Sequence, residues 1–567
     1  MNTSQRILLT GQSGIRMARM IEKLRHYVLN RTDFGEFACE SVEDHMVEIH
    51  VQDHPEEAFV KQRGGFQRLL LKPSLYLERL WHRAMARVQS RLPSQGLAII
   101  TMHAVFYHTL ARQFISAVDY HQFKDLGIDK VITLVDDIYD VWARLSEPGQ
   151  LFFVPHKDPP DDASPEVIAA LCDEASLKSI ASLMEILAWR SYEVFSSAEI
   201  ARRIPKPPIV FPVKHCLHTA ANVLFSDRRL VYVSHPIAEP RRLMLSDDAT
   251  LGRELQAEVE SLARCLRVFL RWIPICPTRV DELRIADRAS AAAQGASWPL
   301  LTERWIHPSA DESLWVPTEN HEERALDPLK KERKLGTEVS PLIAVLLSVL
   351  REQITAQINS RDRQLVEQSH ALVVWRPYFN GSLSTGARTE MRHRNLLVDW
   401  GVDNPGDKRC YIYSPRSDLA KWRAGVVAGA LLGLDNPPSQ SQAHSVREAL
   451  VDDSQTFNAL KTGQLDPGAL RRIAENVGVS LVPGATALSR SAVAPDPRTQ
   501  EYEWIQDAWA TIAAQVNRAD EVEKESRPGD YWCEEEGVKP EEFVEQVVKQ
   551  WKLEPACASE KQTGEET

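Results

Sequence analysis

The sequence predicts an α/β protein with two parallel-sheet domains and a smaller helical region after them. Short apolar runs alternate with longer segments of helical periodicity, which is the pattern of parallel βαβ units. Two apolar runs end in turns of small residues that lead into a helix, where open α/β sheets bind ligands. The chain has 567 residues, enough for about two to four domains.

The first predicted domain covers residues 1–225. Its strand candidates are short apolar runs at Ile7–Thr10, Leu97–Met102, Lys130–Val135 and Ile209–Val213. Amphipathic helical patterns lie between them, among them residues 17–29 and 182–204. Strands that alternate with helices in this way predict a parallel sheet with helices on its faces.

The second predicted domain covers residues 226–435, and a third region covers 436–567. The second opens with a strand near residue 231. It continues with helical stretches at 251–273 and 340–368, a strand at 371–375, a helix beginning near Arg388 and a strand at 409–414. The third region holds a linker-like run at 436–445 and two short helices within 457–479. The tail after Val522 is rich in Glu and Lys, and we expect its last ten residues to be disordered.

Charge and cysteine usage exclude some classes of protein. The net charge of −12 argues against a dedicated nucleic-acid binder, whose surface would be basic. The eight cysteines are scattered without a CxxC pair, which indicates reduced thiols in a cytosolic protein. The cluster His215, Cys216 and His218 lacks a second ligand pair, so we expect no metal site. With no signal peptide or transmembrane segment evident, we expect a cytoplasmic protein without a membrane partner.

The run Gly11-Gln12-Ser13-Gly14 follows a predicted strand and precedes a predicted helix. A phosphate loop has this setting, because its glycines let backbone N–H groups surround phosphates. The apolar strand at 129–135 ends in Asp136 and Asp137, the place of a magnesium-binding aspartate. The first domain therefore resembles the P-loop NTPase family, most closely its nucleotide-kinase and AAA-type members. The resemblance implies nucleotide binding by Gly11, Ser13, Gly14, Arg16, Asp136 and Asp137.

Three residues depart from that family pattern. Arg16 stands in place of the second glycine, Met17 in place of the lysine, and Ala18 in place of the hydroxyl residue. Without the lysine, the charge of the terminal phosphate is not neutralised. Without the hydroxyl, one ligand of the magnesium ion is missing. We therefore expect a degenerate P-loop domain that serves assembly or senses a nucleotide, with a Mg-nucleotide as its conceivable ligand, rather than an active NTPase.

The stretch 371–390 combines a hydrophobic strand, a turn with Ser384 and Gly386, and the carboxylate of Glu390. The turn places backbone N–H groups at the carboxyl end of the strand, and Glu390 falls one turn into the helix. A carboxylate there could attack a sugar C1′ or stabilise the oxocarbenium ion formed as a base departs. A first-turn glutamate that only stabilises its helix is the alternative.

The spacing Ser384-x-Gly386-x-x-x-Glu390 resembles that of nucleoside 2-deoxyribosyltransferases and related nucleotide N-glycosidases. The strand and turn at 228–242, with Tyr232 and then Ser234-His235-Pro236, resemble the first strand of that family, and 358–375 resembles its helix and glutamate strand. The resemblance implies a second, Rossmann-like α/β domain in which Glu390 is the nucleophile and Tyr232 orients it. Ser384, Gly386, His235 and Arg241 would contact the substrate.

Two departures from this family favour a phosphorylated substrate. The family has an acidic residue where Ser384 stands, and another where the chain has Ser369-His370. A hydroxyl at 384 resembles the members that act on nucleotides, and Arg241 could add positive charge for a phosphate.

These patterns together predict cleavage or transfer of the N-glycosidic bond of a nucleotide or nucleoside, with no cofactor required for the glycosidic chemistry. The pseudo-P-loop domain would regulate or assemble the enzyme, as a homo-oligomer or with a partner protein, and antiviral defence or stress response would suit such an architecture. Two alternatives stay open: a non-catalytic nucleotide sensor or scaffold, and a divergent P-loop nucleotide kinase or ATPase.

Overall fold

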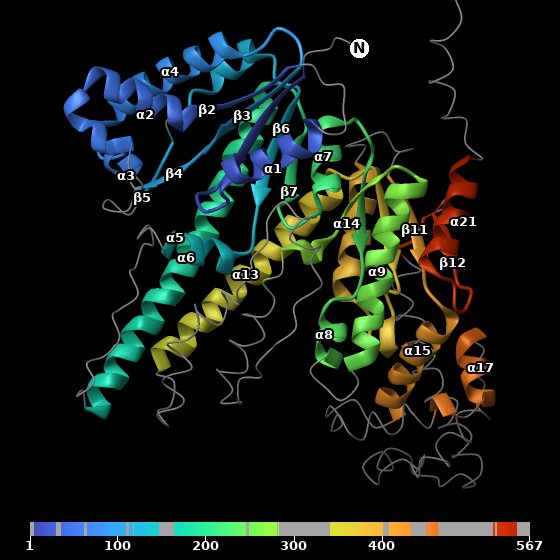
Figure 1. Ribbon diagram of the computed structural model, residues 1–567. Helices are drawn as coiled ribbons and strands as arrows, with labels where there is room; N and C mark the ends of the chain where they lie inside the picture. Colours follow the sequence, from blue (N-terminus) through green and yellow to red (C-terminus); the bar gives the residue numbers. More distant parts are fainter. Residues whose placement is uncertain are drawn as a thin grey trace, which may run out of the picture. The chain divides into compact units, whose positions relative to one another are not determined.

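The chain folds into two compact units, each built on a five-stranded sheet (Figure 1). The N-terminal unit comprises residues 1–230 and 275–368, and the C-terminal unit comprises 231–274 and 369–567. This computed structural model describes residues 5–29, 36–61, 65–108, 113–116, 118–146, 164–244, 249–280, 282, 341–400, 408–431, 450–452, 454–462, 525–527 and 530–552. Two parallel sheets flanked by helices confirm the predicted α/β class.

The sheet of the N-terminal unit is parallel throughout. Its strands, in spatial order, are β2 (Phe37–Ser41), β3 (Leu97–Met102), β1 (Gln5–Gly11), β6 (Lys130–Val135) and β7 (Pro208–Pro212). Strand β3 is buried along its whole length, which is why it has an unbroken apolar sequence. Four of these strands were predicted. The fifth, β2, is a half-buried edge strand whose sequence FACES lacks that apolar signal.

The helices of the N-terminal unit enclose two apolar cores. They are α1 (Met17–Leu29), α2 (Val42–Asp53), η1 (Pro55–Lys61), α3 (Gly65–Leu69), α4 (Ser74–Arg91), η2 (Tyr120–Leu126), α5 (Ile138–Ser146), α6 (Pro165–Arg203), α7 (Leu217–Phe225), η3 (Pro277–Arg279) and α13 (Pro341–Glu367). One core gathers α2 and α4 around Trp81 and Phe123. The other joins α5, α6 and α13 around Trp142 and Trp189. A two-stranded antiparallel ribbon, β4 (Phe106–His108) with β5 (Gln113–Ile115), lies beside them.

Helix α13 runs along α6 and belongs to the N-terminal unit (Figure 1). Its buried Leu347 and Leu350 join the α5–α6 core, and Arg190 of α6 donates a hydrogen bond to Gln357 Oε1 (2.8 Å). The predicted division at 226–435 places this helix with the following strand instead. Among the helices that the structure describes, α13 is the one with the length and apolar composition that a membrane span needs.

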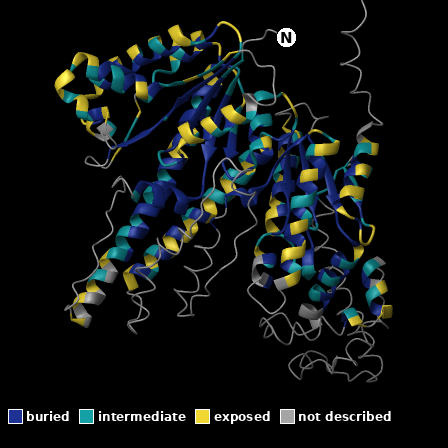
Figure 2. Ribbon diagram, viewed as in Figure 1, coloured by how far each residue is buried: buried dark blue, intermediate teal, exposed yellow. Residues whose placement is uncertain are grey.

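The sheet of the C-terminal unit has the spatial order β12 (Tyr531–Cys533), β11 (Arg409–Tyr413), β10 (Ala371–Trp375), β8 (Leu230–Ser234) and β9 (Ile273–Ile275). Counted along the chain this order is 2-1-3-4-5, that of flavodoxin-like doubly wound sheets. Its helices are α8 (Ala238–Met244), α9 (Ala249–Phe269), η4 (Phe379–Gly381), α14 (Thr385–Asp399), α15 (Arg416–Leu431), α17 (Ser454–Thr462) and α21 (Pro540–Lys552). Figure 2 shows buried strands and helices whose outer faces are exposed.

The C-terminal region supplies β12 and α21 to this sheet and its cover. A region predicted as helical therefore also contains the last strand. The predicted linker at 436–445, the second helix predicted within 457–479 and the end of the charged tail lie outside the described residues.

Gly96 has a backbone conformation that no other residue would tolerate. Its φ is +102°, and a Cβ there would lie 2.3 Å from the carbonyl oxygen of Glu36. Hydrogen bonds at Gly96 and Leu97 link the beginnings of β1, β2 and β3. Gln5 N–H donates to Gly96 O (2.9 Å), and Leu97 N–H donates to Glu36 O (2.8 Å).

We predict that Gly96→Ala lowers the free energy of unfolding of the N-terminal unit by at least about 3 kcal/mol, because the backbone must shift. Gly127→Ala is the matched control: its φ is also positive (+60°), but the nearest atom to its Cβ is Arg6 Nη1 at 3.5 Å. That change should cost about 1 kcal/mol. Urea denaturation of both variants gives the comparison, and equal losses would contradict the steric argument.

Candidate functional site

The two strands that carry the predicted catalytic residues are neighbours in the C-terminal sheet. β8 pairs with β10 in parallel, with Leu372 opposite Tyr232 and Val374 opposite Ser234. From β8 the chain goes to β9 on one side, and later returns to β10 on the other. The carboxyl ends of β8 and β10 therefore form the topological switch point of the sheet, where doubly wound folds bind ligands.

Two hydroxyl groups from β8 hold the Glu390 carboxylate at this switch point. Tyr232 Oη donates to Glu390 Oε1 (2.7 Å), and Ser234 Oγ donates to Oε2. Tyr232 and Ser234 are two residues apart on one strand, so their side chains point to the same face of the sheet. Tyr232 is fully buried, while Glu390 retains 7% of its exposure. The carboxylate is thus fixed in orientation.

The segment between β10 and α14 is a tight turn that brings α14 back over the sheet. Asn380 and Gly381 have positive φ values of 50° and 72°, and Ser384 N–H donates to Pro377 O (2.8 Å). Ser384 Oγ caps α14 by accepting from Ala387 N–H (3.2 Å). A Cβ on Gly386 would meet only Ser384 Oγ, at 3.8 Å, so protein packing does not require a glycine there. Its lack of a side chain leaves room beside the helix N-terminus.

Arg376, at the start of this turn, is bound within the protein. Its guanidinium donates to Asp418 Oδ2 (2.8 Å) and to Glu258 Oε1 (3.2 Å). Burial opposes the charged form of Arg376, but hydrogen bonds and charge from Asp418 and Glu258 outweigh it and raise the pKa. The pair of acids ties the turn to α9 and α15, and so positions the N-terminus of α14.

A buried ion pair anchors α14 one turn beyond Glu390. Arg394 donates to both oxygens of Asp530, at 2.9 and 2.5 Å, and both side chains are almost fully buried. Asp530 also accepts from Cys410 N–H (3.2 Å) at the start of β11. Because Asp530 directly precedes β12, the C-terminal strand fixes the helix that carries Glu390.

The structure brings Glu390 and Tyr232 together, as the sequence pattern predicts. Ser384 and Gly386 lie at the N-terminus of the same helix, and His235 is buried after Ser234 with Nδ1 3.2 Å from Val233 O. The side chain of Arg241 lies outside the described residues. Sequence reasoning missed Ser234 as a partner of Glu390. The signal was its position two residues beyond Tyr232, on the same face of the strand.

In the N-terminal unit, the loop after β1 has the course of a turn between strand and helix. Gly14 and Arg16 have φ values of +92° and +55°, and α1 begins at Met17. A Cβ on Gly14 would lie 3.2 Å from Val141 Cγ1, so α5 packs closely against this loop. Glycine at 14 is therefore explained both by its φ and by this contact.

Two positively charged side chains of the protein, Arg144 and Lys214, form ion pairs with the aspartates that follow β6. Arg144 Nη1 lies 2.7 Å from Asp136 Oδ2 and donates to Gly14 O (2.9 Å). Lys214 Nζ, from the segment after β7, lies 2.5 Å from Asp140 Oδ2 and within 4 Å of Asp136 and Asp137. All five side chains are buried. A magnesium ion would have to displace Arg144 and Lys214 from Asp136, so these residues do not fit the expected metal.

Glu193 of α6 fastens the start of the loop to the end of β3. The N–H groups of Gly11 (3.0 Å) and Ala104 (2.8 Å) donate to Oε1, and that of Val105 donates to Oε2 (2.9 Å). His103 Nδ1 lies 2.7 Å from the acceptor Gly11 O, so this nitrogen carries the proton, and Nε2 faces Ser13 Oγ at 3.4 Å. Gly11 and Ser13 are thus engaged by the protein.

A pocket of about 480 Å³ opens beside this loop. Gly14 and Arg16 line it together with residues from β2, β3 and α5: Cys39, Ser41, Thr101, His103 and Arg144. Glu43 and Asp44 add acidic groups, and burial raises the pKa of Glu43. The mixed charge of the lining suits a small polar molecule better than a triphosphate with its metal.

Comparison with protein-family models and with curated proteins finds no match to this chain. The candidate sites therefore stand on their own geometry.

Glu193 should make the stability of the N-terminal unit depend on pH. Burial raises its pKa from an ordinary 4.5 to about 7, against the opposing effects of His103 and the three N–H donors. The folded state therefore holds the proton more tightly than the unfolded chain. The stability that this proton provides is present below about pH 4.5 and is lost as the pH rises through about 7.

We predict that Glu193→Gln, which cannot titrate, removes this component of the pH dependence. The free energy of unfolding of the wild type should fall more steeply between pH 4.5 and 7 than that of the variant. Urea denaturation across that range measures both slopes. Parallel curves would show that Glu193 does not titrate in this interval.

Proposed function

We propose that the C-terminal unit cleaves or transfers the N-glycosidic bond of a nucleotide or a related molecule, with Glu390 as the nucleophile. The observation that supports this most is the Glu390 carboxylate itself, almost buried and held by Tyr232 and Ser234 at the switch point of the sheet. Catalytic carboxylates need a fixed orientation toward the reacting carbon. A helix-stabilising glutamate would not need two donors from a neighbouring strand.

In the proposed reaction a carboxylate oxygen of Glu390 attacks C1′ of the sugar. The bond from C1′ to the base nitrogen breaks, and the base leaves with the electron pair and takes up a proton. Water or an acceptor base then attacks C1′ and releases Glu390, giving hydrolysis or transfer. Each carboxylate oxygen accepts a hydroxyl donor from β8, and these two bonds hold the carboxylate in one orientation for the attack.

The turn between β10 and α14 supports a polar or phosphorylated group on the substrate. The space at Gly386 lies at the N-terminus of the 15-residue helix α14, where backbone N–H groups and the helix dipole favour negative charge. Arg376 is not available for this role, because Asp418 and Glu258 bind its guanidinium.

We predict that Glu390→Gln abolishes release of free base from a mixed pool of nucleotides and nucleosides, by at least about 10³-fold, because the amide is not a nucleophile. Liquid chromatography with mass detection identifies any released base. Glu254→Gln, on the exposed side of α9, is the matched control and should keep full activity. Base release that persists in Glu390→Gln, or is absent from the wild type with every substrate, would reject the proposal.

Tyr232→Phe and Ser234→Ala each remove one donor to the carboxylate and should each lower kcat by about 10- to 100-fold, since hydrogen bonds to charged groups contribute about 1.5–3 kcal/mol. Tyr531→Phe, which removes a hydroxyl bonded to Gln546 (2.6 Å) on the edge strand, is the control. Unchanged kcat in both site variants would show that Glu390 does not depend on these donors.

A second candidate function, from another class, is ligand sensing by the N-terminal unit. The pocket of about 480 Å³ beside the loop favours it, as does the internal neutralisation of Asp136. We infer binding of a small polar molecule, such as a nucleotide, without metal and without turnover. On this proposal the N-terminal unit resembles P-loop NTPases in the path of its backbone and not in catalysis. A role of the protein in antiviral defence or stress response stays a prediction.

A further inference from the structure

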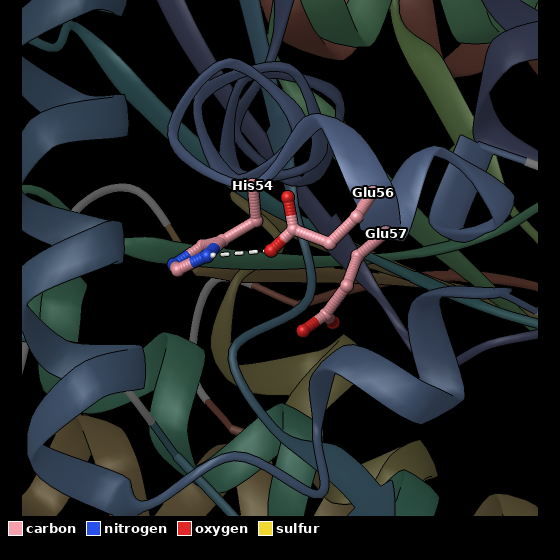
Figure 3. A group of neighbouring side chains, drawn as sticks. All are labelled: His54, Glu56 and Glu57. Carbon is pink, nitrogen blue, oxygen red and sulfur yellow. Dashed lines mark ion pairs between the residues drawn. The ribbon is translucent and has the colours of Figure 1, made fainter.

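A cluster of side chains with possible metal-ligand atoms lies where α2 ends and η1 begins, in the N-terminal unit. Donor atoms of His54, Glu56 and Glu57 all lie within 4.8 Å of one another, the one such group in the part of the chain that the structure describes. His54 is the residue after α2, and both glutamates belong to the first turn of η1. Figure 3 shows the His54 ring and the Glu56 carboxylate facing each other, with Glu57 beside them.

The spacing of these atoms approaches that of ligands around one ion. His54 Nδ1 and Glu56 Oε1 are 3.4 Å apart. Two ligands at about 2.1 Å from a tetrahedral Zn²⁺ lie about 3.4 Å from each other. An imidazole with two carboxylates is a donor set suited to zinc and similar divalent ions, and three protein ligands leave a position for water.

A buried histidine supports the third ligand from behind. His50 is fully buried, with Nε2 3.1 Å from Glu57 Oε2 and Nδ1 2.6 Å from Tyr76 Oη. A carboxylate only accepts, so Nε2 carries the proton and Nδ1 accepts from the tyrosine hydroxyl. Such hydrogen bonds orient carboxylate ligands in metal sites.

Lys72 is the competitor for the same carboxylate. Its Nζ lies 2.7 Å from Glu57 Oε1. The ammonium also repels an arriving cation, so the site would bind more weakly than one without this lysine.

We propose that His54, Glu56 and Glu57 bind a divalent cation of the zinc class, with water completing its coordination, and that this ion ties the end of α2 to η1. The proposal is independent of the reaction assigned to Glu390. Its consequence is stabilisation of the N-terminal unit by the metal, because an ion bound only to the folded state shifts the unfolding equilibrium.

The test uses the full chain, freed of metal with a chelator and then titrated with Zn²⁺ by calorimetry. We expect one site per chain, weakened at least about 10-fold in His54→Gln and in Glu57→Gln. His26→Gln, at an exposed histidine on α1, is the matched control and should leave that site intact. Absence of a single site, or equal weakening in the control, would show scattered surface binding and overturn the proposal. Co²⁺ absorption reports the coordination geometry independently.

A second variant tests the position of the ion. Lys72→Met should tighten Zn²⁺ binding several-fold, because it removes the cation that competes for Glu57. Lys61→Met, an exposed lysine at the end of η1, controls for general charge and should have a smaller effect. Zn²⁺ should also raise the unfolding temperature of the Lys72→Met protein. Binding that is unchanged or weakened by Lys72→Met would place the ion elsewhere and overturn the assignment.

Discussion

A carboxylate removed from water needs hydrogen bonds, and the C-terminal unit is arranged around that need at Glu390. Strand alternation provides two hydroxyl donors, Tyr232 and Ser234, on one face of β8. The 2-1-3-4-5 order puts β8 beside β10, so the helix that follows β10 can deliver its glutamate to those donors. A different strand order would separate the residues, although their sequence would be unchanged. The candidate site is thus a property of the topology as much as of the side chains.

Acidic residues at the sheet edges have different kinds of partner in the two units. In the N-terminal unit Asp136 forms an ion pair with Arg144, and Asp140 forms one with Lys214. The negative charge of both aspartates is therefore neutralised within the protein. In the C-terminal unit two neutral hydroxyls, those of Tyr232 and Ser234, donate to Glu390 and orient its carboxylate. The proposed attack on a sugar carbon needs a carboxylate that is held in a fixed orientation. This difference agrees with our proposal of glycosidic chemistry in the C-terminal unit and of ligand sensing in the other.

The sequence predicted correctly the helices and strands that have a long periodic or apolar pattern. Helix α1 matches the predicted 17–29, and the buried strands β1, β3, β6 and β10 follow from their unbroken apolar runs. Short edge strands such as β2 and β12 were missed, because three to five half-buried residues carry little periodicity. The pairing of Tyr232 with Glu390 was predicted. The cations at Asp136 were not, because Arg144 and Lys214 come from segments whose packing no local pattern encodes.

The ion pair between Arg394 and Asp530 shows why the end of the chain belongs to the candidate site. Helix α14 is held at its N-terminus by the Ser384 cap and the Arg376 turn, and one turn past Glu390 by Asp530. Asp530 also binds Cys410 N–H, so it registers α14 against β11 and β12 together. Since a shift of about 1 Å in a nucleophile is costly to catalysis, these buried contacts would matter to the reaction that we propose for Glu390. Asp530 is therefore part of the scaffold that positions Glu390, although the two residues are 140 positions apart in the sequence.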